Sequence, residues 1–188
     1  MARVGKVAVT EVSEEDGREI YELCAESFGI KNQLGVLANR PPILKNLMKM
    51  YWEVAQEQLV PLRYIEIGVL TASKLNACEY CITQHTPRLI GNGLSPESAL
   101  NLLEPDCPGL DDADRLVRDY AAAVTRHAAQ IPDELFARLK EKFSDAQIVE
   151  LTVRIGLAGF FNRLNEALEI EIEDGAQDAF QVATQTAA

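Results

Sequence analysis

Residues 76–85 of the chain read NACEYCITQH. This stretch holds two of the four cysteines, Cys78 and Cys81, in a C-x-x-C spacing, and His85 follows four residues after the second. In an α-helix with Asn76 as its N-cap, the three side chains would stand at i, i+3 and i+7, on one face. Neighbouring thiols can close a small disulfide, a helix N-terminus lowers the pKa of nearby thiols, and histidine transfers protons near neutral pH. The stretch therefore favours a redox centre.

Two other interpretations of the cysteines compete with a redox centre. A zinc site takes four ligands, usually from two separated pairs, and the sequence has no second C-x-x-C and no H-x-x-x-H. Cysteines can also serve simply as small buried hydrophobic side chains. We expect no metal ion. Cys24 lies on an apolar helical stripe and should be buried, Cys107 in the loop 104–109 should be exposed, and His127 should lie near a helix C-terminus. We assign no catalytic role to these three residues.

Composition limits the class of protein. The chain has 188 residues, an apolar content of 47% and a formal net charge of −11. The apolar content is sufficient for a core, and the negative charge argues against a nucleic-acid partner. We see no apolar signal segment at the N-terminus, and the apolar run 155–161 is too short to span a bilayer. We therefore expect a cytoplasmic protein that does not enter membranes, in which a C-x-x-C is catalytic rather than structural.

The hydrophobic pattern predicts helices throughout and no strand, so we expect an all-α fold. Residues 1–12 should form an extended arm, residues 13–173 a helical domain, and residues 174–188 a mobile polar tail. Each expected helix begins with a capping residue or a proline. These starts lie near Ser13, Pro41, Pro61, Asn76, Ser95, Asp111, Pro132 and Ser144.

The expected helix 41–57 has an unusually broad apolar face. It includes Met48, Tyr51 and Trp52. A face this wide favours a core on one side and a partner surface on the other. We therefore expect a homo-oligomer.

A single carboxylate interrupts the next helix. Glu66 lies among apolar residues that recur almost all round this helix, which indicates a buried element. A buried glutamate requires a partner, and burial disfavours its charged form, so that it can carry protons. The other interpretation is a solvated position on an imperfect stripe.

A short internal similarity links the two halves of the chain. The pattern at 65–69, I-E-I-x-V, resembles V-E-L-x-V at 149–153, 84 residues later. At this offset the paired cysteines correspond to Asn162 and Asn165. Two related helical units or shared helix patterning would both produce this similarity.

The spacing of Glu66, the C-x-x-C pair and His85 resembles a family signature. It follows the pattern E-x(11)-C-x-x-C-x(3)-H of alkylhydroperoxidase D-like proteins, in the carboxymuconolactone decarboxylase family. The segments 143–145 and 149–164 are also similar to this family. The resemblance covers roughly residues 35 to 170, and the motif is specific as a set.

The resemblance implies an all-helical bundle of the alkylhydroperoxidase D type that assembles as trimers or hexamers. It implies that Cys81 is the peroxidatic thiol, that Cys78 is the resolving thiol and proton donor, and that the two form a redox-active disulfide. Glu66 and His85 would complete a proton relay, and Tyr80 would line the site. The decarboxylases that name the family generally lack the paired cysteines, so the thiol-dependent branch matches better.

The function expected from this resemblance is reduction of an alkyl hydroperoxide by the cysteine pair. No flavin, haem or nicotinamide motif is present, so we expect no cofactor and an external dithiol donor, either a lipoyl protein or a thioredoxin-like protein. Two alternatives remain. One is a redox-sensing disulfide protein with little peroxidase activity, and the other is a decarboxylase-type enzyme that does not depend on Cys78 and Cys81.

Overall fold

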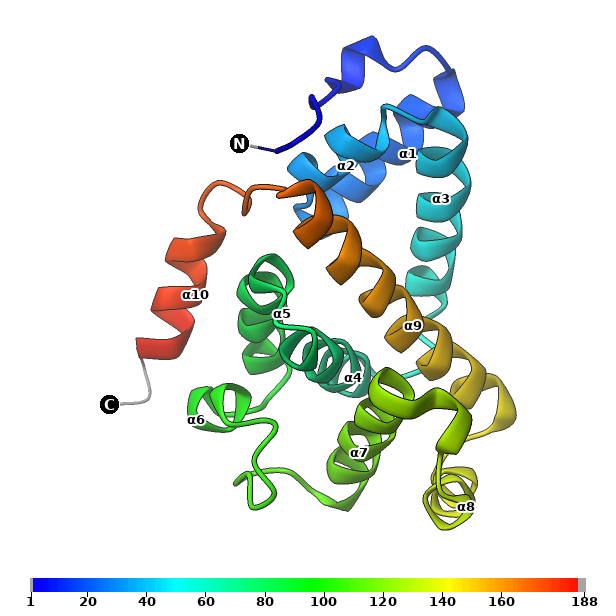
Figure 1. Cartoon of the computed structure of the whole chain (residues 1–188), viewed down its shortest axis with the longest axis vertical. Coiled ribbons are helices and arrows are strands. Elements are labelled where there is room, and N and C mark those ends of the chain that lie inside the picture. Colours follow the sequence, from blue (N-terminus) through cyan, green and yellow to red (C-terminus); the bar gives the residue numbers. More distant parts are fainter. Residues whose placement is uncertain (1, 186–188) are drawn as a thin grey trace. The chain divides into compact units, whose positions relative to one another are not determined.

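A computed structural model describes residues 2–185, which form helices joined by turns and contain no strand (Figure 1). The predicted all-α class is confirmed. The α-helices are α1 (Glu15–Phe28), α2 (Lys31–Leu37), α3 (Pro41–Glu57), α4 (Leu62–Leu75), α5 (Glu79–Gly91), α6 (Pro96–Leu100), α7 (Asp112–His127), α8 (Asp133–Lys142), α9 (Asp145–Leu168) and α10 (Ala176–Gln185). Two short 3₁₀ helices, Val9–Glu11 and Ala128–Gln130, complete the elements.

The chain divides into two compact units. The first unit comprises the residues up to Gln58 together with 164–174, and the second comprises 59–163 together with the residues from Gly175 onward. Helix α9 contributes to both, because the boundary falls after Arg163.

In the first unit, α1 packs against α3 and α2. Helix α1 ends at Gly29, which has a left-handed φ of 66°, as the sequence predicts. Segment 164–174 joins this unit through long-range hydrogen bonds. Gln33 Nε2 donates to Asn165 Oδ1 over 2.8 Å, and the Asn32 backbone N–H donates to Glu173 Oε1 over 2.8 Å.

Helix α3 divides its apolar residues between core and surface. Met48, on the predicted broad apolar face, is fully buried, and its carbonyl oxygen lies 3.9 Å from Cys24 Sγ. The exposed large apolar side chains of this helix are Ile43 and Met50. Tyr51 and Trp52 are half-buried.

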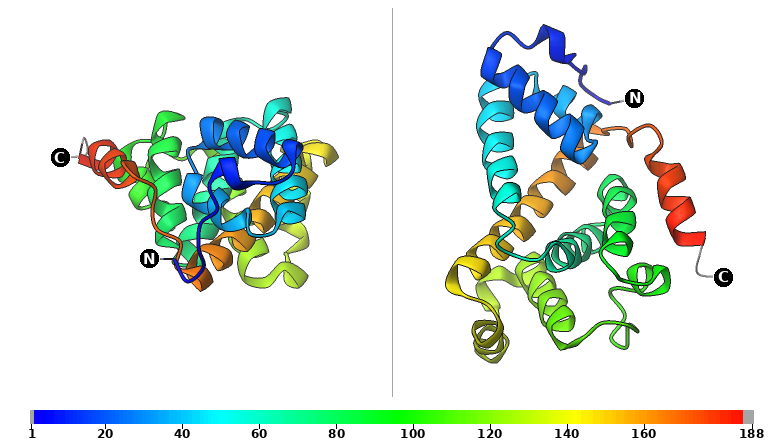
Figure 2. Two further views of the ribbon diagram at one scale, coloured as in Figure 1. Left: turned by 90° about the horizontal axis from the view of Figure 1, so that it is seen from above. Right: turned by 180° about the vertical axis from the view of Figure 1, so that it is seen from behind.

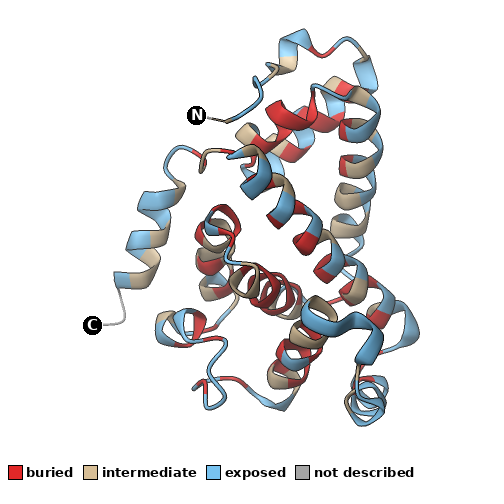
Figure 3. Ribbon diagram, viewed as in Figure 1, coloured by how far each residue is buried: buried red, intermediate tan, exposed pale blue. Residues whose placement is uncertain are grey.

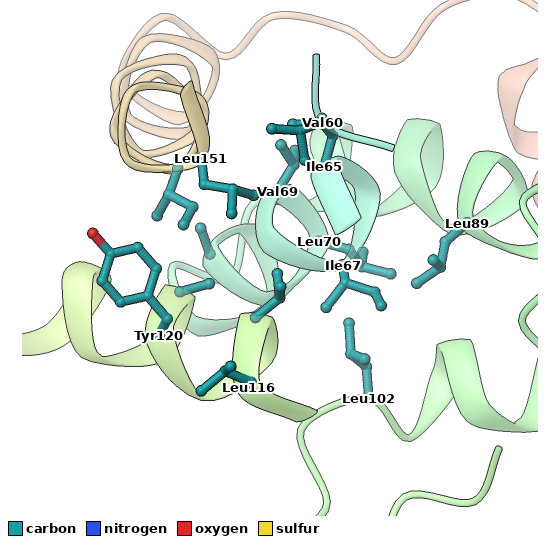
Figure 4. Close-up of a cluster of buried hydrophobic side chains, with 14 of the residues drawn as sticks. Val60, Ile65, Ile67, Val69, Leu70, Leu89, Leu102, Leu116, Tyr120 and Leu151 are labelled. Atoms are coloured by element: carbon teal, nitrogen blue, oxygen red, sulfur yellow. The ribbon is translucent and has the colours of Figure 1, made fainter. Parts of the chain in front are cut away.

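The second unit is built around α4. Residues 65 to 73 of this helix are all buried, as its nearly all-round apolar sequence predicts (Figure 3). Helices α5 and α7 pack against it. Figure 4 shows its side chains Ile67 and Leu70 meeting Leu89 and Leu102, with Leu116 and Tyr120 of α7 nearby.

Most predicted helix starts are confirmed. Pro41 begins α3, Ser95 Oγ accepts the N–H of Ser98, and Asp111 caps α7. Ser144 and Gln147 exchange the two hydrogen bonds of a capping box.

Two predicted caps are wrong by one or two residues. The N-cap of α1 is Glu14 rather than Ser13, and the N-cap of α5 is Cys78 rather than Asn76. Asn76 is instead the C-cap of α4.

Helix α10 lies within the segment predicted to be a mobile tail. It packs against α5 and α6, and Figures 1 and 2 show it beside α5 in each direction of view. Its residues are half-buried or exposed (Figure 3). Among the helices of residues 2–185, none has the length and apolar character needed to cross a membrane.

A buried ion pair ties the start of α4 to the start of α7. Arg63 donates through Nε and Nη2 to Asp114, over 2.9 and 2.6 Å, and the Asp114 side chain is fully buried. The same carboxylate accepts the backbone N–H of Asp111. The hydrogen bond to Asp114 raises the pKa of Arg63, which therefore stays charged.

We predict that Arg63→Ala destabilises the protein by about 3–5 kcal/mol, because it leaves the Asp114 carboxylate buried without its partner. Lys140→Ala is the matched control. It removes an exposed ion pair with Asp145, and should change stability by less than about 0.5 kcal/mol. Urea unfolding of both variants measures the difference, and equal midpoints would contradict the prediction.

Candidate active site

The contact between Glu66 and His85 is the centre of the candidate site. Helix α4 supplies Glu66 and α5 supplies His85, and the two helices pack against each other. Glu66 Oε2 lies 2.7 Å from His85 Nδ1, and the side chains are 10% and 13% exposed. The predicted buried carboxylate is confirmed, and the interpretation of Glu66 as a solvated position is wrong.

This contact fixes how the histidine can act. When Glu66 is ionised, Nδ1 must carry the proton that lies between them, because a carboxylate only accepts. Nε2 of His85 is then the nitrogen left to accept a second proton. The pair can therefore take up a proton at one atom and hold the resulting charge beside a carboxylate.

The two cysteines of the motif stand at the beginning of α5. Cys78 is the N-cap, with extended backbone (φ −84°, ψ 102°), and Cys81 lies in the first turn. The expectation that Cys78, Cys81 and His85 share one helical face therefore needs correction. Only Cys81 and His85 are related by helical i, i+4 spacing. Cys78 lies just outside the helix because the chain turns there from α4 into α5.

The location still suits thiol chemistry. The first turn of a helix presents backbone N–H groups and the positive end of the helix dipole, and both favour negative charge. Cys78 is fully buried, and Cys81 and Tyr80 are nearly so. Tyr80, expected to line the site, immediately precedes Cys81 on α5.

A hydrogen-bonded group near the thiols was not predicted from the sequence. It consists of Asn162, Asn76 and Ser73. Asn162 of α9 bonds to the side chains of Asn76 and Ser73, which flank the turn before Cys78. The available signal was a polar amide next to the apolar stripe that ends at Phe161. The internal similarity, with its offset of 84 residues, also included Asn162. It aligned Asn162 with Cys78, however, and did not indicate that Asn162 contacts the turn before Cys78.

The other sequence-predicted positions lie elsewhere. Cys24 is buried in the first unit, as predicted, while Cys107 was expected to be exposed and is buried. The Cys107 thiol points inward and donates to the carbonyl of Ser98 over 3.3 Å, which explains its burial despite charged neighbours in sequence. His127 is the last residue of α7, as predicted. Within residues 2–185, no cluster of three or more His, Cys, Asp or Glu side chains has the arrangement of a metal site.

Comparison with known proteins bears on this site. Residues 41–108, which include Glu66, both cysteines of the motif and His85, match the model of the carboxymuconolactone decarboxylase family. The resemblance to this family is confirmed.

Solved structures share the whole fold. A peroxidase-related protein of uncharacterized function from Silicibacter sp. TM1040 is 23% identical, with a TM-score of 0.77 over 95% of each chain. An alkylhydroperoxidase AhpD core protein from Ralstonia eutropha JMP134 is 18% identical, with a TM-score of 0.77 over 97% of this chain and 96% of the other. The debrominase Bmp8, in complex with 2,3,4-tribromopyrrole, is 15% identical, with a TM-score of 0.79 over 96% of each chain. The chain therefore has the alkylhydroperoxidase D-like fold.

We predict that Cys24 and Cys107 resist alkylation in the native protein. Burial raises the pKa of Cys24 to about 12 and also raises the pKa of Cys107, so near pH 8 almost no thiolate is present. Mass spectrometry after iodoacetamide treatment should find both cysteines unmodified until urea is added. Native labelling of either at the rate seen in urea would contradict this prediction.

Proposed function

We propose that this protein is a thiol-dependent hydroperoxide reductase. The observation that carries the proposal is the buried contact of 2.7 Å between Glu66 of α4 and His85 of α5, a helix with Cys78 as its N-cap and Cys81 in its first turn. Family resemblance supports the same function. The proposed substrate is a small alkyl hydroperoxide, and the proposed electron donor is an external dithiol on a lipoyl or thioredoxin-like protein.

The reaction has three steps. In the first, the Cys81 thiolate attacks one oxygen of ROOH, the O–O bond breaks, Cys81 becomes a sulfenic acid, and the alkoxide takes a proton to leave as ROH. In the second, the Cys78 thiol attacks the sulfenic sulfur, a disulfide forms, and water departs. In the third, a dithiol reduces the disulfide by exchange and is itself oxidised.

Glu66 and His85 handle the protons of the first two steps. His85 lies one helical turn after Cys81, and in this mechanism its imidazole accepts the thiol proton and returns it to the departing alkoxide. Glu66 holds the ring in one orientation and stabilises the imidazolium that forms. Neither residue changes oxidation state.

The site rather than the fold supports this choice of reaction. Bmp8 has the same fold and is a debrominase, so the fold alone does not select a reaction. The two alternatives from the sequence also use this fold. A redox sensor would form the disulfide without turning over peroxide, and a decarboxylase-type enzyme would not need the thiols.

Homo-oligomeric assembly, as trimers or hexamers, is part of the proposal.

Trapping of the sulfenic acid tests the proposal. We predict that Cys78→Ser treated with one equivalent of hydroperoxide accumulates a dimedone-reactive sulfenate at Cys81, whereas Cys81→Ser forms none and has lost peroxidase activity. Dihydrolipoamide, reduced thioredoxin and glutathione are then compared as donors for the native chain. Peroxidase activity that survives both substitutions would reject the thiol mechanism, and a sulfenate only at Cys78 would reverse the two roles.

We predict that Glu66→Gln lowers peroxide turnover by roughly 10²–10⁴-fold, because the amide keeps the shape of the side chain but has no charge to stabilise the imidazolium through which the proton is transferred. Glu150→Gln is the matched control. Glu150 is also 8% exposed and lies on α9 beside Arg154. It should retain turnover close to that of the native protein. Steady-state peroxidase rates distinguish the two variants, and circular dichroism verifies that both are folded. Near-full activity of Glu66→Gln would contradict the prediction and leave the proton relay to His85 alone.

A further inference from the structure

We propose that Asn162 of α9 is a positioning residue for the resolving thiol, Cys78. This role rests on the proposed function of the Cys78–Cys81 pair, and it concerns the step in which the two sulfurs join. Asn162 acts through the turn between α4 and α5, which sets where Cys78 lies.

The turn is a helix C-terminus with an unfavourable residue at its critical position. The Ala77 N–H donates to the carbonyl of Lys74 over 3.2 Å, and the Cys78 N–H donates to the carbonyl of Ser73 over 3.0 Å. These two bonds define a Schellman motif, in which the residue after the C-cap takes a left-handed conformation and is usually glycine. Here that residue is Ala77, with φ 53°. Its Cβ makes this conformation costly, so other contacts must hold the turn.

Asn162 supplies those contacts. Its side chain is 1% exposed, and Oδ1 accepts from Asn76 Nδ2 over 2.9 Å, while its Nδ2 donates to Ser73 Oγ over 3.1 Å. Ser73 Oγ donates in turn to the carbonyl of Val69 over 2.8 Å. The Asn162 side chain therefore bonds to two residues of the turn. One is Asn76, the C-cap of α4, and the other is Ser73, whose carbonyl accepts the Cys78 N–H.

The consequence is specific to one step. In the proposed mechanism His85 rather than Cys78 supplies the proton when Cys81 attacks a peroxide, so this step should not depend on the turn. Closure of the disulfide does, because two sulfurs bond only within a narrow range of separation and angle. Loss of the Asn162 contacts lets Ala77 leave its left-handed conformation and moves Cys78 away from its productive position.

The test is a titration of the Cys78–Cys81 pair of the full chain in glutathione redox buffers, which needs no peroxide. For Asn162→Ala we expect the equilibrium constant for disulfide formation to fall about tenfold, which corresponds to a potential about 30 mV more oxidising. The rate of sulfenate formation at Cys81 should stay within about threefold of the native rate, while disulfide closure slows about tenfold or more.

Two further variants exclude general loosening of the fold. Asn165→Ala removes another buried amide of α9, one that bonds to Gln33 in the first unit, and should leave the equilibrium constant unchanged. Ala77→Gly added to Asn162→Ala should restore closure, because glycine adopts the left-handed turn without the tether. If Asn162→Ala does not fold, Asn162→Asp decides, since it keeps the acceptor for Asn76 and loses the donor to Ser73.

The outcomes separate this inference from the proposed function. A native chain that forms no sulfenate with peroxide rejects the peroxidase, yet the redox titration still decides the role of Asn162. A folded Asn162 variant with a native equilibrium constant overturns the positioning role. An equal shift in Asn165→Ala, or no rescue by Ala77→Gly, overturns it as well.

Discussion

A carboxylate inside an otherwise apolar helix is the constraint on which the second unit depends. Residues 65 to 73 of α4 are all buried, so the Glu66 carboxylate is largely removed from water and needs a partner within the protein. His85 is that partner, at 2.7 Å. Their contact fixes the rotation of α5 against α4, and Cys81 then stands one turn before the imidazole.

The short connection between the two helices completes the arrangement. Only residues 76 to 78 join the end of α4 to the start of α5. The C-terminal cap of one helix is therefore continuous with the N-terminal cap of the next, and Cys78 belongs to both motifs. Such a junction leaves little freedom for the sulfur, which explains why a residue as distant in sequence as Asn162 can influence it.

The parts of this structure that depend on local chemistry were predictable from the sequence. Prolines and capping residues mark the helix starts, and the apolar pattern of α4 predicts its burial. Glu66 was recognisable because a charge in that pattern demands a partner. Tertiary packing decided the rest. Cys107, in the loop 104–109, turns its thiol inward to the carbonyl of Ser98. Asn76 could cap either neighbouring helix, and in the structure it ends α4, where its side chain donates to Asn162.

The two buried glutamates of the second unit show why position alone does not create a proton relay. Glu66 and Glu150 are equally buried and occupy matching places in the internal similarity of the chain. Glu150 lies beside Arg154, whose guanidinium donates hydrogen bonds and accepts none. Glu66 lies beside the imidazole of His85, whose ring nitrogens can accept or donate a hydrogen bond according to the tautomer. The two carboxylates therefore differ in their partners. A guanidinium only donates hydrogen bonds, whereas an imidazole nitrogen can both accept and donate a proton, as the proposed relay through Glu66 and His85 requires.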